Sequence, residues 1–95
     1  MEIIWTKQAI RSVNEIVDYI AQDDYDTAEQ WALELMSQTD KLADHPRIGR
    51  VVPEYNEETL RELIVGNYRL PYRIKEDGIY IEAVWHVRQM TPKND

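Results

Sequence analysis

Apolar residues in the first half of the chain recur every three or four positions in two separate stretches. This spacing places them along one side of an α-helix, so each stretch predicts an amphipathic helix. The first helix is predicted over residues 7–21, with apolar positions Ala9, Ile10, Val13, Ile16, Val17 and Ile20. The second is predicted from residue 26, with apolar positions Ala28, Trp31, Ala32, Leu35, Met36, Leu42 and Ala43. Only residues 22–25 separate the two stripes, which predicts an antiparallel helical hairpin with both stripes facing one sheet.

Short polar signals mark the ends of these helices. Residues 1–5 are β-branched and end in an aromatic, which predicts a short strand, and Thr6 then offers a side-chain oxygen as the N-cap of the first helix. Asp26 and Glu29 have the spacing of a capping box at the start of the second helix. Pro46 disfavours helix at the residue before it, so the second helix is expected to end there.

After Pro46 the pattern changes from helical spacing to the alternation typical of strands. The predicted strands cover residues 50–53, 60–65, 68–75 and 79–87. Gly66–Asn67 and Asp77–Gly78 tolerate positive φ and predict tight turns between the last three strands. Because a proline cannot donate to a strand ladder, we expect a bulge or an unpaired donor position at Pro71. The order predicts an α+β fold in which an N-terminal strand and an antiparallel helical hairpin precede an antiparallel sheet.

Alternation within the last two strands assigns their side chains to two faces. One face of the third strand carries Tyr68, Leu70, Tyr72 and Ile74, and the other carries Arg69, Pro71, Arg73 and Lys75. In the fourth strand, Ile79, Ile81, Ala83, Trp85 and Val87 alternate with Tyr80, Glu82, Val84 and His86. Two arginines of one strand are therefore expected to share a face.

Length and composition place these elements in a single domain, residues 1–95. The chain has no cysteine, which removes disulfides and thiolate metal ligands and suits a reducing compartment, so the cytoplasm is expected. Apolar runs are short and charges occur early, so we expect no signal peptide or membrane span. The sequence has no catalytic triad, metal-ligand spacing or Gly-rich phosphate loop, and neither a metal nor another cofactor is expected.

Charge is divided unevenly along the chain. The formal net charge is −7; residues 1–46 hold three basic and ten acidic residues, and residues 47–95 hold eight of each. This acidity argues against direct, specific DNA binding by the chain. Six of the seven arginines lie in the second half: Arg47, Arg50, Arg61, Arg69, Arg73 and Arg88. They form either solvated strand faces paired with neighbouring glutamates or an arginine surface that binds a partner.

Five segments resemble, in order along the chain, the RelE/ParE toxins of bacterial toxin–antitoxin modules. They are WTKQA at residues 5–9, LADHPRIGR at 42–50, LREL at 60–63, YRLPYRI at 68–74 and AVWHVR at 83–88. The resemblance implies a helical hairpin on a twisted sheet, a role in plasmid stabilisation or growth arrest, and a cognate antitoxin from a neighbouring gene. It also implies autoregulation through the DNA-binding N-terminal part of that antitoxin.

Toxins of this family share a fold but differ in target, and the fold does not decide between targets. RelE-like members cut messenger RNA in the ribosome, whereas ParE-like members inhibit DNA gyrase. Arg69 matches the arginine of the RelE-like Tyr-Arg strand and Arg88 a later arginine, but residues 60–63 lack the lysines of the preceding strand, and no tyrosine follows Arg88. His86 is the remaining candidate for acid–base chemistry, although a strand histidine is more often structural.

The resemblance and these departures favour a ParE-like toxin that inhibits DNA gyrase by binding and is neutralised by its antitoxin. One alternative is a RelE-like, ribosome-dependent and metal-independent endoribonuclease with Arg69, His86 and Arg88 as catalytic candidates. Another is a non-toxic relic that only binds antitoxin. The candidate residues for binding the target or the antitoxin are Arg61, Arg69, Arg73, His86 and Arg88. We expect the antitoxin to present a basic stretch to the acidic helices and an acidic or apolar one to the arginines.

Overall fold

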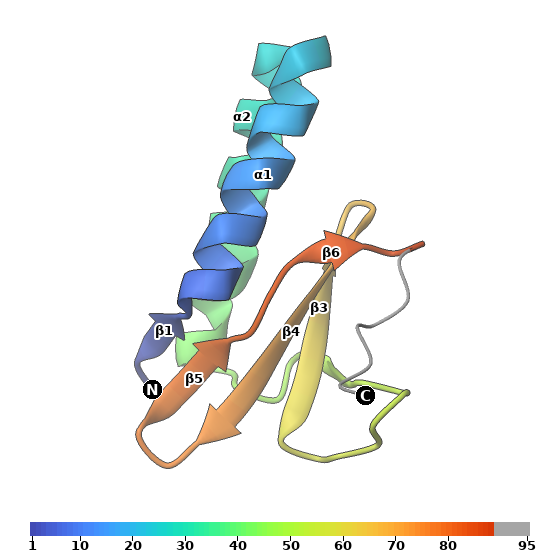
Figure 1. The fold of residues 1–95 in the computed structure, drawn as a ribbon. Coiled ribbons are helices and arrows are strands. Elements are labelled where there is room, and N and C mark those ends of the chain that lie inside the picture. Colours follow the sequence, from blue (N-terminus) through green and yellow to red (C-terminus); the bar gives the residue numbers. More distant parts are fainter. Residues whose placement is uncertain (89–95) are drawn as a thin grey trace.

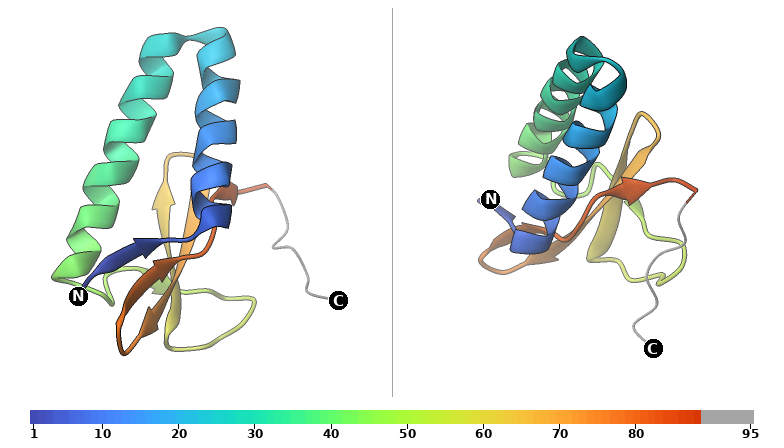
Figure 2. Two further views of the ribbon diagram at one scale, coloured as in Figure 1. Left: turned by 60° about the vertical axis from the view of Figure 1, so that its left-hand side comes forward. Right: turned by 45° about the horizontal axis from the view of Figure 1, so that its top comes forward.

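The computed structural model describes residues 1–88 and consists of two helices packed on one face of a sheet (Figures 1 and 2). The elements are β1 (Ile3–Trp5), α1 (Lys7–Asp23), α2 (Tyr25–Asp40), the 3₁₀ turn η1 (Lys41–Ala43), β2 (Arg50–Val51), β3 (Leu60–Val65), β4 (Tyr68–Lys75), β5 (Gly78–Ile81) and β6 (Trp85–His86). The predicted α+β class and helical hairpin are confirmed. The predicted strands over residues 60–65 and 68–75 have the observed bounds.

The sheet has the strand order β1-β5-β4-β3-β2, and β6 pairs with β4 beyond the end of β5. The β2–β3, β3–β4 and β4–β5 pairs are antiparallel, as predicted. In contrast, β1 is parallel to β5, with Ile3 opposite Ile79. No tight turn joins these two strands, so no hairpin geometry requires them to be antiparallel. The strands that follow the hairpin are therefore antiparallel, as predicted, and the N-terminal strand makes the whole sheet mixed.

The strand predicted over residues 79–87 is divided into β5 and β6. Tyr72 of β4 faces the last residue of β5, and Arg69 faces the first residue of β6. Three residue steps along β4 thus match four along its partner, which is the geometry of a β-bulge. The extra residue lies opposite Pro71, whose carbonyl oxygen accepts a hydrogen bond from the Glu82 amide at 3.0 Å. The expected bulge at this proline is confirmed.

The bulge reverses the faces predicted for the residues that follow it, because an offset of one residue moves each side chain to the opposite face of a strand. Val84 belongs to the core on the hairpin side. His86 lies opposite Tyr68 on that side, whereas Trp85 lies opposite Arg69 on the other side. The predicted faces of Val84, Trp85 and His86 are therefore wrong.

A single residue, Asp24, joins α1 to α2, where a four-residue connection was predicted. Asp24 is extended and caps α2, because its Oδ1 accepts from the amides of Asp26 at 3.0 Å and Thr27 at 3.4 Å. A further hydrogen bond from the Thr27 hydroxyl lowers the pKa of Asp24. The predicted capping box at Asp26 is therefore wrong, whereas the N-cap at Thr6 is confirmed by acceptance from the Ala9 amide at 3.1 Å.

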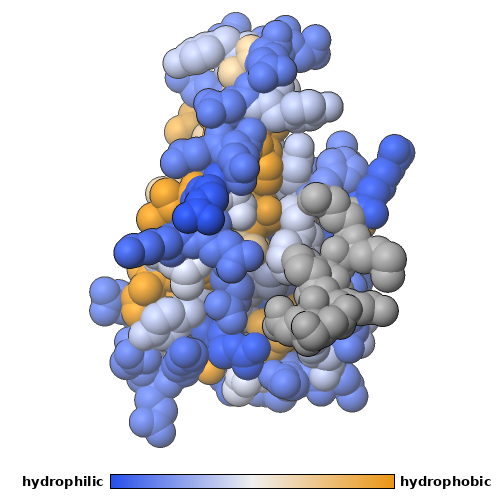
Figure 3. Space-filling model, in the orientation of Figure 1, coloured by the Kyte–Doolittle hydropathy of each residue, from blue (hydrophilic) through white to orange (hydrophobic). Residues whose placement is uncertain are grey.

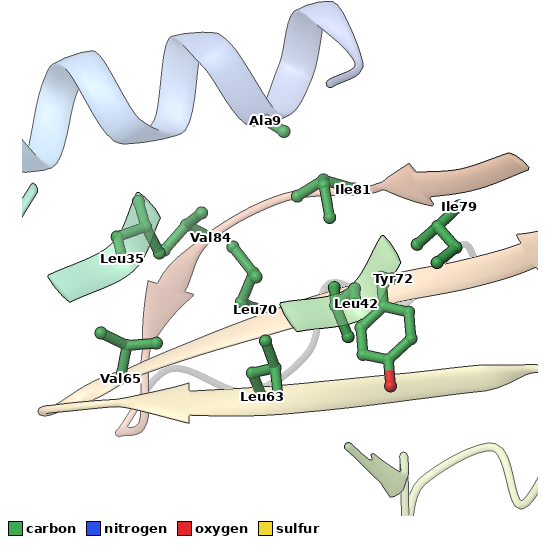
Figure 4. Packing of buried hydrophobic residues seen from close by; sticks show 10 residues of the cluster. All are labelled: Ala9, Leu35, Leu42, Leu63, Val65, Leu70, Tyr72, Ile79, Ile81 and Val84. Carbon is green, nitrogen blue, oxygen red and sulfur yellow. The ribbon is translucent and has the colours of Figure 1, made fainter. Parts of the chain in front are cut away.

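The core lies between the hairpin and the sheet (Figure 4). Its buried side chains are Ala9, Leu35, Leu42, Leu63, Val65, Leu70, Tyr72, Ile79, Ile81 and Val84. α1 buries only Ala9, and α2 buries only Ala28, Leu35 and Thr39. The hairpin projects beyond the sheet in both figures of the fold (Figures 1 and 2). The two apolar stripes therefore face the sheet, as expected, but only over part of their length.

Apolar residues consequently reach the surface of the hairpin between hydrophilic ones (Figure 3). Ile10 of α1 is 48% exposed, and Leu33 and Met36 of α2 are 64% and 50% exposed. Leu33 and Met36 are three positions apart, so they lie on the same side of their helix. We call Ile10, Leu33 and Met36 the exposed hairpin residues.

Tyr72 holds the segment between α2 and β2 against the sheet. Its hydroxyl oxygen accepts from the Gly49 amide at 3.0 Å and donates to the Pro46 carbonyl at 2.7 Å. A Cβ atom at Gly49 would lie 2.5 Å from the carbonyl oxygen of Glu62 and 2.7 Å from the Tyr72 hydroxyl. Gly49 is therefore required because two backbone segments approach each other closely there.

We expect the substitution Gly49→Ala to lower the free energy of unfolding by about 1–3 kcal/mol, because the backbone must shift to admit the methyl group. Urea denaturation followed by tryptophan fluorescence measures this change. Ser37→Ala, at an exposed position of α2, is the control and should retain the wild-type midpoint. A wild-type midpoint for Gly49→Ala would contradict the close approach.

Candidate functional site

The face of the sheet opposite the hairpin carries the candidate site. Residues that face each other across an antiparallel pair point to the same side of a sheet. Glu62 is paired with Pro71, and Arg69 with both Ile64 and Trp85. Because the alternate residues Leu70 and Tyr72 belong to the core, these side chains point away from the hairpin. We call this side, with Glu62, Arg69, Pro71, Arg73 and Trp85, the outer sheet face.

Arg69 is buried on the outer sheet face, and all three of its side-chain nitrogens donate to carboxylates. The residue is only 7% exposed. Its Nε donates to Glu62 at 2.7 Å, and its two terminal nitrogens donate to the two oxygens of Glu54 at 2.7 and 2.8 Å. The hydrogen bonds to Glu54, followed by those to Glu62, raise the pKa of Arg69. Arg69, a predicted catalytic or binding residue, is therefore held inside the protein by Glu54 and Glu62.

Glu62 joins this arginine to a second one. It is 1% exposed, and its second oxygen accepts from Arg50 Nε at 2.6 Å. A buried carboxylate is costly unless it is paired and hydrogen-bonded, and two guanidinium groups meet that requirement here. The chain of contacts from Arg50 through Glu62 and Arg69 to Glu54 ties β2, β3, β4 and the segment after β2 together.

Arg73 is more accessible than Arg69 on the outer sheet face. Its side chain is 34% exposed and donates to Glu57 at 3.1 Å and to Glu82 at 3.2 Å. Hydrogen bonding to Glu57 is the main cause that raises the pKa of Arg73. These pairs confirm that the strand arginines are paired with glutamates, although Arg69 is buried rather than solvated.

Arg61 lies on the opposite side of the sheet from these arginines, because it faces Tyr72 across β3 and β4. It donates to the Gly49 carbonyl at 2.9 Å and to a carboxylate oxygen of Glu58 at 3.0 Å. Arg47 also donates to Glu58, at 2.6 Å, and this hydrogen bond is the main cause that lowers the pKa of Glu58. Arg61 therefore anchors the segment before β2 and does not converge with Arg69 and Arg73.

His86 also lies away from the outer sheet face. Its ring packs against Tyr68 on the hairpin side, with 5.3 Å between the ring centroids. Its Nδ1 accepts from the Arg88 amide at 3.1 Å. Arg88 is exposed, and it forms no ion pair within residues 1–88. The nuclease candidates Arg69, His86 and Arg88 are therefore not assembled around one point on the described surface.

A recess of about 270 Å³ opens on the outer sheet face. Leu60, Pro71 and Ala83 give it apolar walls, and Trp85 adds an aromatic one. Arg73 and Glu82 supply charge beside these walls. The bulge contributes to this shape, because it turns Trp85 to the outer sheet face, where Trp85 lines the recess together with Pro71.

Sequence reasoning missed the buried carboxylate at the centre of this face. The glutamates near the strand arginines were expected to be solvated, yet Glu62 alternates with Leu60 and Ile64 along β3 and is buried. The signal that could have identified the buried carboxylate is a single acidic residue that alternates with apolar residues, on a strand next to one that carries arginines. Glu54 lies in the segment after β2, where no periodicity exists to place it.

Within residues 1–88 the structure contains no group of three or more histidine, aspartate or glutamate side chains arranged to hold a metal ion. None of the helices in that range combines the length and the apolar character that crossing a bilayer requires.

Comparison with known proteins agrees with this two-layer architecture. A family model described as "ParE toxin of type II toxin-antitoxin system, parDE" matches residues 3–91. "Putative toxin Y4kP" of Sinorhizobium fredii is 38% identical over 93 residues, covering 96% of this chain and 93% of that protein. "Toxin RelE2" of Caulobacter vibrioides is 31% identical over 90 residues, covering 94% and 98%.

A solved structure titled "Chromosomal ParDE TA system from P. aeruginosa" has the same fold, with a TM-score of 0.74 and 21% identity. The match covers 90% of this chain and 95% of that one. The architecture and the sequence matches define a small α+β toxin. The chain belongs to the ParE/RelE family of type II toxin–antitoxin toxins, and this membership implies a cognate antitoxin as its partner.

Proposed function

We propose that this toxin acts by binding a protein target, DNA gyrase, and that it does not cut RNA. The observation that carries the proposal is the engagement of Arg69. A nuclease needs cationic donors for the charge that develops on a transferring phosphate, and these donors must be free to reach it. Arg69 has its donors directed at Glu54 and Glu62 and is 7% exposed.

The position of His86 supports the same proposal. A general acid or base must come within hydrogen-bond reach of the reacting group, directly or through one water molecule. His86 packs against Tyr68 on the hairpin side, whereas Arg69 and Arg73 lie on the outer sheet face. A phosphodiester group bound on the outer sheet face would therefore contact the arginines but not the imidazole of His86.

The acidity of the chain adds a further argument. The net charge of −7 repels a surface walled by ribosomal RNA and slows association with it. Binding a protein carries no such general penalty. We propose the cytoplasm as the compartment in which the toxin acts, because gyrase, the proposed target, acts on DNA there.

We further propose that the antitoxin covers the exposed hairpin residues with an amphipathic segment. Ile10, Leu33 and Met36 offer apolar contact area, and residues 1–46 carry ten acidic residues against three basic ones. An antitoxin helix with a basic side and an apolar side would complement both features. The antitoxin would then neutralise the toxin by covering this surface. Growth arrest would follow when the antitoxin is lost.

A DNA supercoiling assay tests the proposed function. Purified toxin should stop gyrase from supercoiling relaxed plasmid, and added antitoxin should restore the activity. The substitution His86→Ala should leave this inhibition unchanged, because the imidazole has no chemical step to perform. Unimpaired supercoiling at a toxin concentration that arrests growth would rule out gyrase, and absence of both effects would identify an antitoxin-binding relic.

A further inference from the structure

The recess on the outer sheet face has walls that suit the stem of a long basic side chain. Leu60 and Pro71 present apolar surface, and Trp85 presents an indole. Lysine and arginine pack their aliphatic stems along such surface while the charge stays at the polar edge. A cation near an aromatic ring gains additional attraction.

The charges beside the recess are complementary to one more cation. Glu57 and Glu82 share the single guanidinium of Arg73, and their side chains are 52% and 39% exposed. Within residues 1–88 neither of these carboxylates pairs with a second cation. An ionised carboxylate accepts more than one hydrogen bond, so Glu82 retains accessible acceptor capacity. An anionic ligand in the recess would, in contrast, find Arg73 already paired with Glu57 and Glu82.

We propose that this recess binds a lysine or arginine side chain of the cognate antitoxin. The stem of that side chain lies along Leu60, Pro71 and Trp85, and its charge pairs with Glu82. Charge complementarity selects a basic segment, because the toxin carries a net charge of −7 and Arg73, the arginine that lines the recess, already has two carboxylate partners. This replaces the expectation of an acidic or apolar segment opposite the arginines. The proposal rests on the family's antitoxin partnership and is independent of the gyrase assignment.

Two matched substitutions test the site through the affinity of purified toxin for its antitoxin. Glu82→Gln and Glu76→Gln change the net charge equally, but Glu76 is an exposed turn residue outside the recess. We expect Glu82→Gln to weaken binding about tenfold or more at low salt, because a desolvated charge pair is lost. Glu76→Gln should change the affinity less than about twofold. Equal affinities for Glu82→Gln and wild type would overturn the proposal.

A second pair of variants separates a charge effect from damage to the fold. Gln8 is exposed at the start of α1 and lines the recess. Gln8→Lys places a competing cation there and should weaken antitoxin binding, whereas Gln8→Glu should strengthen it. The two affinities should converge as salt rises, because screening removes the difference. Effects in the same direction, or no effect from either variant, would overturn the proposal, and thermal melting confirms that each variant is folded.

Discussion

Replacing Arg69 with alanine is expected to destabilise the protein strongly rather than leave a toxin of unchanged stability that is merely inactive. The substitution leaves Glu62, which is 1% exposed, with Arg50 as its remaining cation, and the Arg50 side chain is itself 57% exposed. Breaking a buried ion pair by removing one partner costs about 3–5 kcal/mol. Small domains are stable by only about 5–15 kcal/mol, so a large share of the stability is lost. Thermal unfolding followed by circular dichroism measures this loss.

Arg47→Ala is the matched control for Arg69→Ala. Arg47 and its partner Glu58 have side chains that are 58% and 55% exposed, and a solvated pair of this kind contributes little to stability. The melting temperature of Arg47→Ala should therefore stay close to that of the wild type. If Arg69→Ala melted like the wild type and lost only its toxicity, Arg69 would have a direct functional role and the structural assignment would be wrong.

The bulge at Pro71 explains why the sequence predicted the strands but not the site. Proline at position 71 signals a bulge or an unpaired donor, because its ring nitrogen has no hydrogen to donate. It does not reveal which strand carries the extra residue. The extra residue lies before β6 and reverses the sides of Trp85 and His86. Strict alternation therefore grouped the imidazole with Tyr80 and Glu82, whereas it lies on the hairpin side.

The ion-pair network shows a second limit of sequence reasoning. The excess of arginine in the second half and its glutamate neighbours could be read directly, and the pairing of the strand arginines with glutamates was one of the two predicted outcomes. Which carboxylate each arginine meets depends on tertiary structure, since Arg69 pairs with residues 7 and 15 positions away. The alternation of Glu62 with Leu60 and Ile64 signals its burial, whereas its arginine partners follow from the pairing of β3 with its neighbouring strands.

Leu70→Ala and Leu33→Ala are expected to differ sharply although they remove the same atoms. Leu70 is 0% exposed in the core between sheet and hairpin, so its truncation leaves a cavity and costs about 2–5 kcal/mol. Leu33 is 64% exposed, and its truncation should change the stability of the free toxin by less than about 0.5 kcal/mol. Urea denaturation of both variants gives the comparison.

The same two variants connect the projecting hairpin to antitoxin binding. If the antitoxin covers the exposed hairpin residues, Leu33→Ala should weaken the complex although it leaves the free toxin stable. A large loss of stability in Leu33→Ala would instead show that the Leu33 side chain makes stabilising contacts in the free toxin. Wild-type antitoxin affinity in Leu33→Ala would remove this leucine from the proposed interface.

The central claim is that the arginines of the outer sheet face are structural and that the toxin works by binding. The most direct test is to measure whether messenger RNA stays intact in a purified translation reaction. Toxin is added at the concentration that stops gyrase, and the 5′ ends of the messenger RNA are mapped. The account predicts full-length transcripts and continued protein synthesis. New 5′ ends in phase with the codons, which disappear when His86 is replaced by alanine, would contradict it.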